Sequence, residues 1–230
     1  VYVTDSYNNR IVKLPAGGGA QQVLGFSFSG LDTPLGIAVD GDGNVYVATP
    51  GLLSKLPAGG GAQGDFPIAP LNGDVEVDGA GNVYLADSDG AVLKFPGGAN
   101  SPVDLGFTGL SSPQGLAVTG SGDVYVADGD NQRIVMRPAG GGPQVVVATG
   151  LDSVWDVALD GAGTLFTSLR VVSRVLALPV PGAQIARGFS GLSTPYAVAV
   201  RASGEVFVAD AGLNEVRRLP VGGASQQTLA

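Results

Sequence analysis

The sequence predicts an all-β fold, a six-bladed β-propeller, and three observations lead to it. A strand-like segment recurs about every 41 residues, glycine-rich turns separate the apolar runs, and no window shows helical periodicity over three turns. A period of this length is typical of a four-stranded propeller blade. We therefore expect a single domain over residues 1–230. Its repeats begin at Val1, Val45, Val83, Val124, Leu165 and Val206.

Each repeat contains four strand-like parts. Examples are "GIAVD" (36–40), "VYVAT" (45–49), "RIVKL" (10–14) and "QQVL" (21–24) for the first to the fourth strand. Alternation and a high content of Val, Ile and Tyr predict β-strands for all four. The first strand occurs only five times, because nothing precedes Val1 to supply it. We expect one three-stranded blade whose innermost remaining strand contains Val1–Val3, completed by residues outside the given chain.

The segment "DGDGN" at 40–44 resembles the start of a calcium-binding EF-hand loop. The other repeats lack the middle carboxylate, Asp42, but keep the glycine at the fourth position. Positions six and twelve, where an EF-hand requires Gly and Glu, hold Val45 and Gly51. The segment is therefore predicted to be a hairpin turn in which glycine supplies a positive φ, and not a calcium site.

The composition argues against several classes of function. The net charge is −8, and the 12 Lys and Arg residues are scattered, which opposes binding to nucleic acid. The chain has no histidine, so it lacks the usual general base at neutral pH and the best zinc ligand. No run of about 18 apolar residues is present, so no membrane insertion by this chain is expected. We predict no cofactor, no metal ligand and no catalytic residue.

The motifs "TPLGIAVDGDGNVYVA" (33–48) and "VYVTDSYNNRIVKL" (1–14) resemble NHL repeats over essentially the whole chain. With the "FSGL-x-x-P" links, they are similar to the extracellular six-bladed sensor domains of mycobacterial receptor Ser/Thr protein kinases. The resemblance implies a non-catalytic propeller at the cell surface that binds an unknown extracellular ligand or protein. Two alternatives remain open: a stand-alone secreted NHL adhesion protein, and an enzyme like the calcium-dependent six-bladed lactonases.

Two repeats depart from this pattern, with "ATPGLLSK" at 48–55 and "TSLRVVSR" at 167–174. An acid ends the second strand in four of the other copies, among them Asp5 and Asp128. Five residues later stand Arg10 and Arg133, and this shared spacing predicts ion pairs that brace the turn after the second strand.

The two faces of the predicted propeller differ. One collects the nearly repetitive turns between first and second and between third and fourth strands. The other collects the turns between second and third strands and the links into each inner strand, which vary, as expected for a binding surface. Candidate ligand-binding positions at the mouths of the inner strands are Leu35, Asp74, Glu76, Gln114, Trp155, Asp156 and Tyr196.

Trp155 and Tyr196 occupy equivalent positions of adjacent blades, so their rings should lie close together, and both are favoured anchors. The competing interpretation is that Trp155 fills the place left by a missing proline and belongs to the core. Asp74, Glu76 and Asp156 replace small residues. They either accept hydrogen bonds from backbone donors or water, or bind a cation or polar ligand, with a carboxylate-only calcium site as the extreme case.

Overall fold

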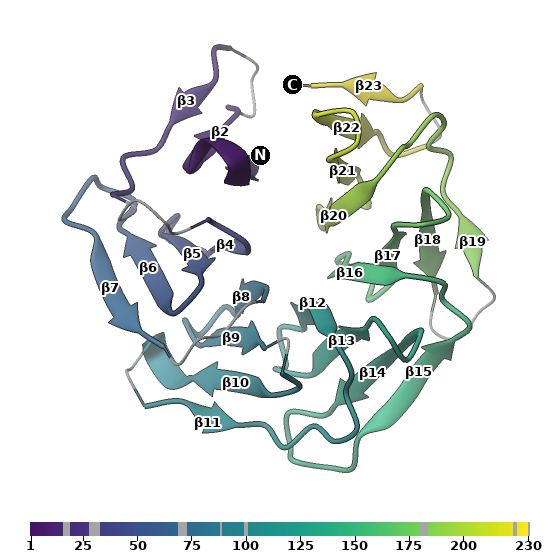
Figure 1. The fold of residues 1–230 in the computed structure, drawn as a ribbon, viewed down its shortest axis with the longest axis horizontal. Helices are drawn as coiled ribbons and strands as arrows, with labels where there is room; N and C mark the ends of the chain where they lie inside the picture. The colour runs from purple at the N-terminus through teal and green to yellow at the C-terminus, as the bar shows by residue number, and fades with distance from the viewer. Residues whose placement is uncertain are drawn as a thin grey trace. The chain divides into compact units, whose positions relative to one another are not determined.

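The structure is a computed structural model that describes residues 1–15, 19–27, 33–68, 73–87, 89–98, 101–179, 184–222 and 225–229. In this part of the chain the strands form six antiparallel sheets, and the fold is an all-β six-bladed propeller (Figure 1). Five sheets have four strands and one has three, as the repeat count predicts. The chain packs as two compact units, Val1–Phe107 and Thr108–Ala230.

The first unit holds the first three blades. Blade one is β1 (Tyr2–Asp5), β2 (Arg10–Lys13) and β3 (Gln22–Val23), with a 3-10 turn, η1 (Ser6–Asn8), after β1. Blade two is β4 (Ile37–Val39), β5 (Val45–Thr49), β6 (Leu52–Leu56) and β7 (Gly64–Pro67). Blade three is β8 (Val75–Val77), β9 (Val83–Ala86), β10 (Val92–Phe95) and β11 (Val103–Asp104), with η2 (Pro96–Gly98) after β10.

The second unit holds the other three blades. Blade four is β12 (Pro113–Val118), β13 (Val124–Asp128), β14 (Arg133–Arg137) and β15 (Val145–Thr149). Blade five is β16 (Val154–Leu159), β17 (Leu165–Leu169), β18 (Arg174–Leu178) and β19 (Ile185–Ala186). Blade six is β20 (Pro195–Val200), β21 (Val206–Asp210), β22 (Glu215–Leu219) and β23 (Gln227–Thr228).

Strands pair with their neighbours in sequence order within every blade, which is the four-part repeat predicted from the sequence. The first blade begins with its second-strand equivalent, β1, as expected. Among the described residues, η1 and η2 are the only helical segments. No helix in the described ranges has the length and apolar character needed to cross a membrane.

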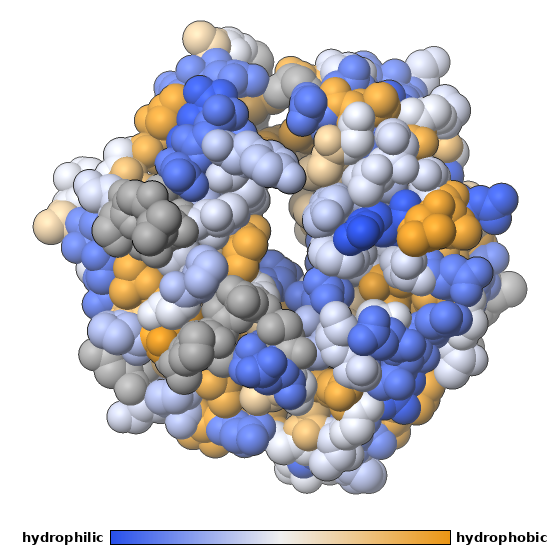
Figure 2. All heavy atoms as spheres, in the orientation of Figure 1, coloured by the Kyte–Doolittle hydropathy of each residue, from blue (hydrophilic) through white to orange (hydrophobic). Residues whose placement is uncertain are grey.

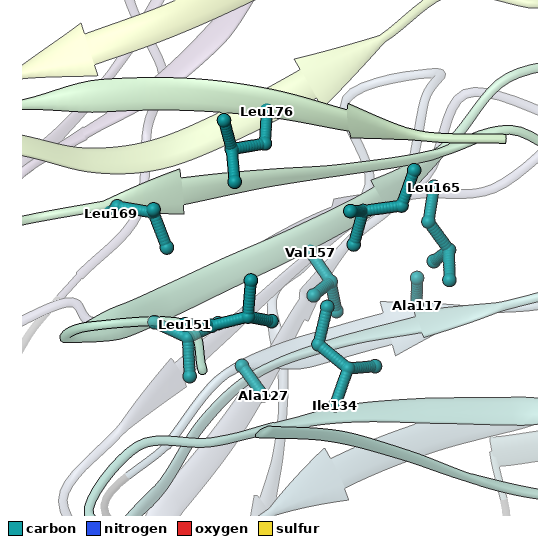
Figure 3. Packing of buried hydrophobic residues seen from close by; sticks show 10 residues of the cluster. Ala117, Ala127, Ile134, Leu151, Val157, Leu165, Leu169 and Leu176 are labelled. Atoms are coloured by element: carbon teal, nitrogen blue, oxygen red, sulfur yellow. The ribbon is translucent and has the colours of Figure 1, made fainter. Parts of the chain in front are cut away.

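The core lies between neighbouring sheets of each unit. In the second unit, Ile134 and Ala127 of blade four face Val157 of blade five, and Leu165 and Leu176 extend the same cluster (Figure 3). A further cluster joins blades five and six. In the first unit, similar clusters join blades one and two and blades two and three. Alternation along each strand supplies apolar side chains to both faces of a sheet, so neighbouring blades within each unit pack against one another.

The turn at 40–44 adopts the predicted glycine conformation. Gly43 has φ +85°, and its counterparts in blades three to six lie between +76° and +90°. The Asp40 carboxylate accepts hydrogen bonds from the backbone N–H groups of Asp42 (3.1 Å) and Asn44 (2.8 Å) and from the Tyr46 hydroxyl (3.2 Å). Burial raises the pKa of Asp40, but the hydrogen bonds from Asn44, Tyr46 and Asp42 outweigh it, and the pKa lies below its usual value. This carboxylate therefore serves the turn itself.

The same turn is fastened to the turn between the third and fourth strands. Asn44 Oδ1 accepts the backbone N–H of Ala58 at 3.1 Å, and Asp123 Oδ1 accepts that of Ala139 at 2.9 Å. Two copies of the second turn, at 14–20 and 219–224, lie partly outside the described residues, and the first "FSGL" segment, at 28–31, lies wholly outside them. Where it is described, this repetitive face is satisfied by its own hydrogen bonds.

The departure from the repeat in blade two and the repeated acid–arginine spacing both have local structural causes. In blade two, Pro50 and Gly51 (φ +85°) make a two-residue turn, and the Thr49 hydroxyl donates to the Leu52 carbonyl at 3.2 Å. Because this turn is only two residues long, it does not contain the loop that the acid–arginine pair braces in other blades, and Thr49 takes the place of the acid. In the longer loops the predicted ion pairs are confirmed: Arg10 Nε lies 2.6 Å from Asp5 Oδ2, and Arg133 Nε lies 2.6 Å from Asp128 Oδ2.

Three glutamines each bind the link that enters their own blade, a contact that was not predicted from the sequence. Gln144 accepts the Thr108 N–H at 2.9 Å and donates to the Thr108 carbonyl at 3.1 Å. The same two bonds join Gln63 to Ser27 and Gln226 to Ser190. The amide thus imitates one residue of a β-ladder between a blade and the link that precedes it.

Candidate functional site

The inner strands of the second unit each contain a β-bulge. In β16, Val154 pairs with Leu169 and Asp156 with Ser168, so Trp155 is the extra residue. In β20, the residues on either side of Tyr196 likewise pair with consecutive residues of β21. A third register shift lies between Pro113 and Leu116 of β12, which spans Gln114. A bulge re-aims the extra side chain and leaves it outside the regular alternation.

The two bulge aromatics meet, as their equivalent positions predict. The ring centroids of Trp155 and Tyr196 are 4.8 Å apart with an interplanar angle of 66°, an edge-to-face contact. Tyr196 is 37% exposed and Trp155 is half-buried, whereas Val154, at the proline position, is fully buried in the core. Val154 therefore fills the place of the missing proline, and Trp155 is not part of the fully buried core.

Arg170 completes this arrangement. Its guanidinium carbon lies 4.4 Å from the centroid of the Trp155 ring and 5.1 Å from that of Tyr196, and Nη1 donates to the Tyr196 hydroxyl at 3.3 Å. A guanidinium over aromatic faces is attracted by the ring quadrupoles. We call Trp155, Tyr196 and Arg170 the aromatic–arginine cluster.

Polar side chains of blade five hold the cluster in place. Ser168 Oγ accepts the Asp156 N–H at 3.2 Å, directly after the bulge, and donates to the Tyr196 carbonyl at 3.0 Å. The Thr167 hydroxyl donates to the Asp156 carbonyl at 2.8 Å. Ser168 and Thr167 are fully buried, so these bonds are shielded from water. They belong to the segment 167–174 that departs from the repeat, and the departure thus positions the aromatic pair.

Asp156 itself joins blade five to blade six. Its carboxylate accepts the backbone N–H of Val157 at 2.8 Å on one oxygen and that of Val198 at 2.8 Å on the other. Gly115 of blade four leaves the space for it, because a Cβ there would lie 2.6 Å from the Asp156 Cα. These contacts are hydrogen bonds to backbone donors, one of the two roles considered for Asp156 in the sequence.

Gln114, the remaining candidate in the second unit, is half-buried and donates to the Ser112 hydroxyl at 2.6 Å. The other three candidates lie in the first unit. Leu35 is 40% exposed, with its N–H donating to the Ala48 carbonyl at 2.8 Å. Asp74 packs on Gly36, where a Cβ would lie 2.8 Å from the Asp74 Cα.

Glu76 is half-buried on β8, and its Oε2 accepts its neighbour's N–H, that of Val77, at 3.1 Å. Burial, followed by the nearby charge of Asp74, raises the pKa of Glu76 to about 8, against the opposing hydrogen bond from Val77. A carboxyl that is largely protonated at neutral pH is a poor cation ligand. Across the described ranges, no three acidic side chains gather in a way that would hold a metal ion.

Sequence analysis missed Arg170 and the apolar side chains beside it. Val171 is 71% exposed, Val172 is 40% exposed, and both follow Arg170 in the turn after β17. Leu213 is exposed in the corresponding turn of blade six. Figure 2 shows an apolar patch next to strongly hydrophilic atoms in the region of β17 and β18. The signal that could have found them is the departure from the repeat at 167–174.

The fold and the site together define the chain as a six-bladed propeller in which two inner strands and one turn present the aromatic–arginine cluster. Comparisons with known proteins agree with the fold. The profile of the NHL repeat matches residues 110–135, so the chain carries an NHL repeat over most of the first three strands of blade four. A search among curated proteins finds no significant match.

Many solved structures share the fold. A chain of a nidogen/laminin complex is 17% identical, with a TM-score of 0.82 over 98% of this chain and 91% of that one. A streptogramin B lyase is 14% identical, with a TM-score of 0.75 over 99% and 78%. A catalytically inactive virginiamycin B lyase from Staphylococcus aureus, solved with quinupristin, is 11% identical, with a TM-score of 0.73 over 99% and 79%. At these identities the likeness concerns the fold alone.

Proposed function

We propose that this chain is a non-catalytic binding propeller that recognises its ligand through the aromatic–arginine cluster. The observation that carries the proposal is the pair of bulges that aims Trp155 and Tyr196 at each other from neighbouring blades. Trp, Tyr and Arg are the residue types most enriched among binding hot spots. Strands hold the pair rather than a loop, so little order is lost on binding.

The contrast between the two sets of turns supports this assignment. The turns at 40–44 and their counterparts keep the same length and the glycine at the fourth position, and Asp40, Asn44 and Asp123 use their side-chain oxygens for hydrogen bonds within or between these turns. The turns after the second strands differ and present exposed side chains, such as Val171 and Leu213. Greater variation in one set of turns is typical of the binding face of a repeat protein. A chain of the nidogen/laminin complex has the same fold, which is compatible with a protein as the partner.

The finer proposal is that the chain is the extracellular sensor domain of a bacterial receptor Ser/Thr kinase. It rests on the resemblance of "VYVTDSYNNRIVKL" and the "FSGL-x-x-P" links to such domains. Sequencing the gene around this segment tests it: a kinase catalytic domain and an apolar segment of about 20 residues should be encoded upstream. A gene without them would favour a stand-alone secreted adhesion protein.

An enzymatic role has less support. The S. aureus lyase with this fold is described as inactive when one histidine becomes alanine, and this chain has no histidine. The carboxylate-only calcium site of a lactonase is opposed by the raised pKa of Glu76 and by the lack, among the described residues, of three acidic side chains close enough to share a metal ion. Turnover of quinupristin or of a lactone by the purified chain would contradict our proposal.

Selection of binders tests the recognition surface. Peptides selected from a display library on the immobilised chain should bind the Trp155→Ala and Tyr196→Ala variants at least about ten-fold more weakly than the wild type. This corresponds to a loss of about 1.4 kcal/mol in binding free energy. The matched control is Val146→Ser, an exposed residue (52%) on the outer strand β15. The melting temperature of Trp155→Ala should stay within a few degrees of the wild type. Binders that ignore both aromatic substitutions would place recognition elsewhere.

A further inference from the structure

We propose that the partner of the aromatic–arginine cluster is a peptide segment that carries a single carboxylate next to an aliphatic side chain. Arg170 would bind the carboxylate, and Val171 with Val172 would receive the aliphatic side chain. This inference rests on the proposed function, since it assigns the ligand chemistry of the same surface.

Arg170 differs from the arginines that form ion pairs. Within the described ranges, carboxylates lie within 4.0 Å of Arg10, Arg133, Arg201, Arg217 and Arg218. Arg170 has no such partner among the described residues, and its guanidinium makes one hydrogen bond there, to the Tyr196 hydroxyl. A guanidinium has five N–H donors in a planar fork that matches a carboxylate. Stacking on rings engages its faces and leaves its edges for bidentate bonds.

The backbone around Arg170 is already fixed. The Arg170 N–H donates to the Ser153 carbonyl at 3.1 Å, and the Ser173 hydroxyl donates to the Ser193 carbonyl at 2.6 Å. These bonds anchor both ends of the turn at 170–173, the second of them to the link that enters blade six. A turn held in this way loses little conformational freedom when a ligand binds, which favours affinity.

The valines supply the apolar half of the surface. Val171 and Val172 are exposed directly after Arg170, and Leu213 is exposed in the next blade's turn. Large aliphatic side chains at the tips of turns contribute little to the core, and a group of them beside a charge is typical of an interaction site. A ligand that satisfies both halves combines a carboxylate with an aliphatic group.

The net charge restricts the partner further. At −8, the chain repels polyanions at long range. A run of acidic residues or a nucleic-acid backbone is therefore disfavoured, whereas one carboxylate gains the local contact with Arg170 and is little repelled. Charge thus favours an aliphatic segment with one acid over an acidic tract.

An array of synthetic hexapeptides tests the inference. Each peptide presents Asp or Glu next to Val, Ile or Leu, and is matched to its Asn or Gln analogue, in about 150 mM salt. We expect the carboxylate peptides to bind at least ten-fold more tightly than the amide analogues. Arg170→Gln should abolish this preference. Arg187→Gln, the matched control, removes the same charge from an arginine that lies over the Phe166 ring (5.2 Å) and should preserve it.

Two further variants sharpen the readout. Val171→Ser should weaken the carboxylate peptides without removing their preference, whereas Val146→Ser should do neither. Arg170→Lys keeps the charge without the fork, so an intermediate preference is expected. It also serves as the test if Arg170→Gln fails to fold.

The outcomes separate the two proposals. Amide analogues that bind as tightly as the acids, or a preference that survives Arg170→Gln, overturn the inference. If Trp155→Ala still removes that binding, the proposed function stands. Carboxylate peptides that do not bind, while display-selected ligands bind in a Trp155-dependent way, also overturn only the inference. Binding that ignores both Trp155 and Arg170 overturns both.

Discussion

Asp5 and Asp128 hold the same position in two repeats but lie in different surroundings. The Asp128 side chain is fully buried and accepts the Ser111 N–H at 2.7 Å in addition to its pairing with Arg133. The Asp5 side chain is 25% exposed, and its partner is more exposed still. An exposed ion pair contributes little, whereas loss of one partner of a buried pair leaves an uncompensated charge.

We therefore predict that Asp128→Ala lowers the free energy of unfolding by about 3 kcal/mol. Asp5→Ala should lower it by less than about 1 kcal/mol. Urea denaturation of the two variants measures both values. Equal losses in the free energy of unfolding would show that burial does not determine how much these two ion pairs contribute.

Glu76 predicts a dependence of stability on pH. Its pKa is about 8 in the folded chain, against an ordinary value of 4.5, so the native state binds the proton more tightly between these values. The contribution of Glu76 is greatest below pH 4.5 and is lost as the pH rises towards 8. Relative to Glu76→Gln, the wild type should lose at least about 1 kcal/mol between pH 5 and pH 8. Thermal melts across this range that run parallel for the two proteins would contradict the assignment.

At the scale of elements, the turns between first and second strands show how one glycine sets a conformation. Gly81 has φ +76°, a value that L-residues rarely adopt, and an added Cβ would meet open space. Gly79, two residues earlier in the same turn, also faces open space but has no positive φ of this kind. Comparing substitutions at Gly79 and Gly81 therefore separates the effect of backbone strain from that of steric contact.

Gly81→Ala should destabilise the fold by about 1–2 kcal/mol, because the left-handed conformation is costly for a residue with a Cβ. Gly79→Ala should be neutral or slightly stabilising, because it restricts only the unfolded chain. Chemical denaturation compares them. A similar loss in both would mean that contacts, and not φ, govern the turn.

The turn at 40–44 should bind no calcium. The Asp40 carboxylate is engaged by the Asp42 and Asn44 backbones, and the repeats share only its glycine. Calcium at about 1 mM should leave the melting temperature unchanged, since only a ligand of the native state raises it. A sub-millimolar site in calorimetry that vanishes in Asp42→Ala would overturn this prediction.

These elements also show what the sequence could predict and what it could not. The 41-residue period located all six sheets, because alternation and turn glycines act within a few residues of each other. The β-bulges were not predicted, because the pattern of side chains does not show that Trp155 has no partner across the ladder. The role of Arg170 was not predicted, because the two rings that it contacts, Trp155 and Tyr196, come from two different blades. Asp156 was found, but the sequence left its role open between backbone and ligand.

At the scale of the whole molecule, charge is the dominant property. The excess of acidic residues gives −8, and five of the twelve Lys and Arg residues are in ion pairs within the described ranges. The 12 basic residues are scattered along the sequence, which opposes the counterion release that drives binding to nucleic acid.

We predict that fluorescence anisotropy detects no binding of single-stranded RNA or duplex DNA at about 150 mM salt and protein concentrations up to about 100 μM. Lowering the salt should not reveal it either, because repulsion then grows. Binding that strengthens at low salt would indicate a basic surface and contradict the proposed ligand chemistry.

The bulges have a consequence for engineering. Trp155 and Tyr196 face no partner across the ladder, and Gln114 lies within the register shift of β12. Substitutions at these three positions should therefore leave the pairing of their strands undisturbed. Randomising these three positions while keeping Ser168 and Asp156, which fasten the surrounding backbone, should yield a combinatorial library in which most members fold. New specificities can then be sought on one frame, much as antibodies vary their loops on a constant framework.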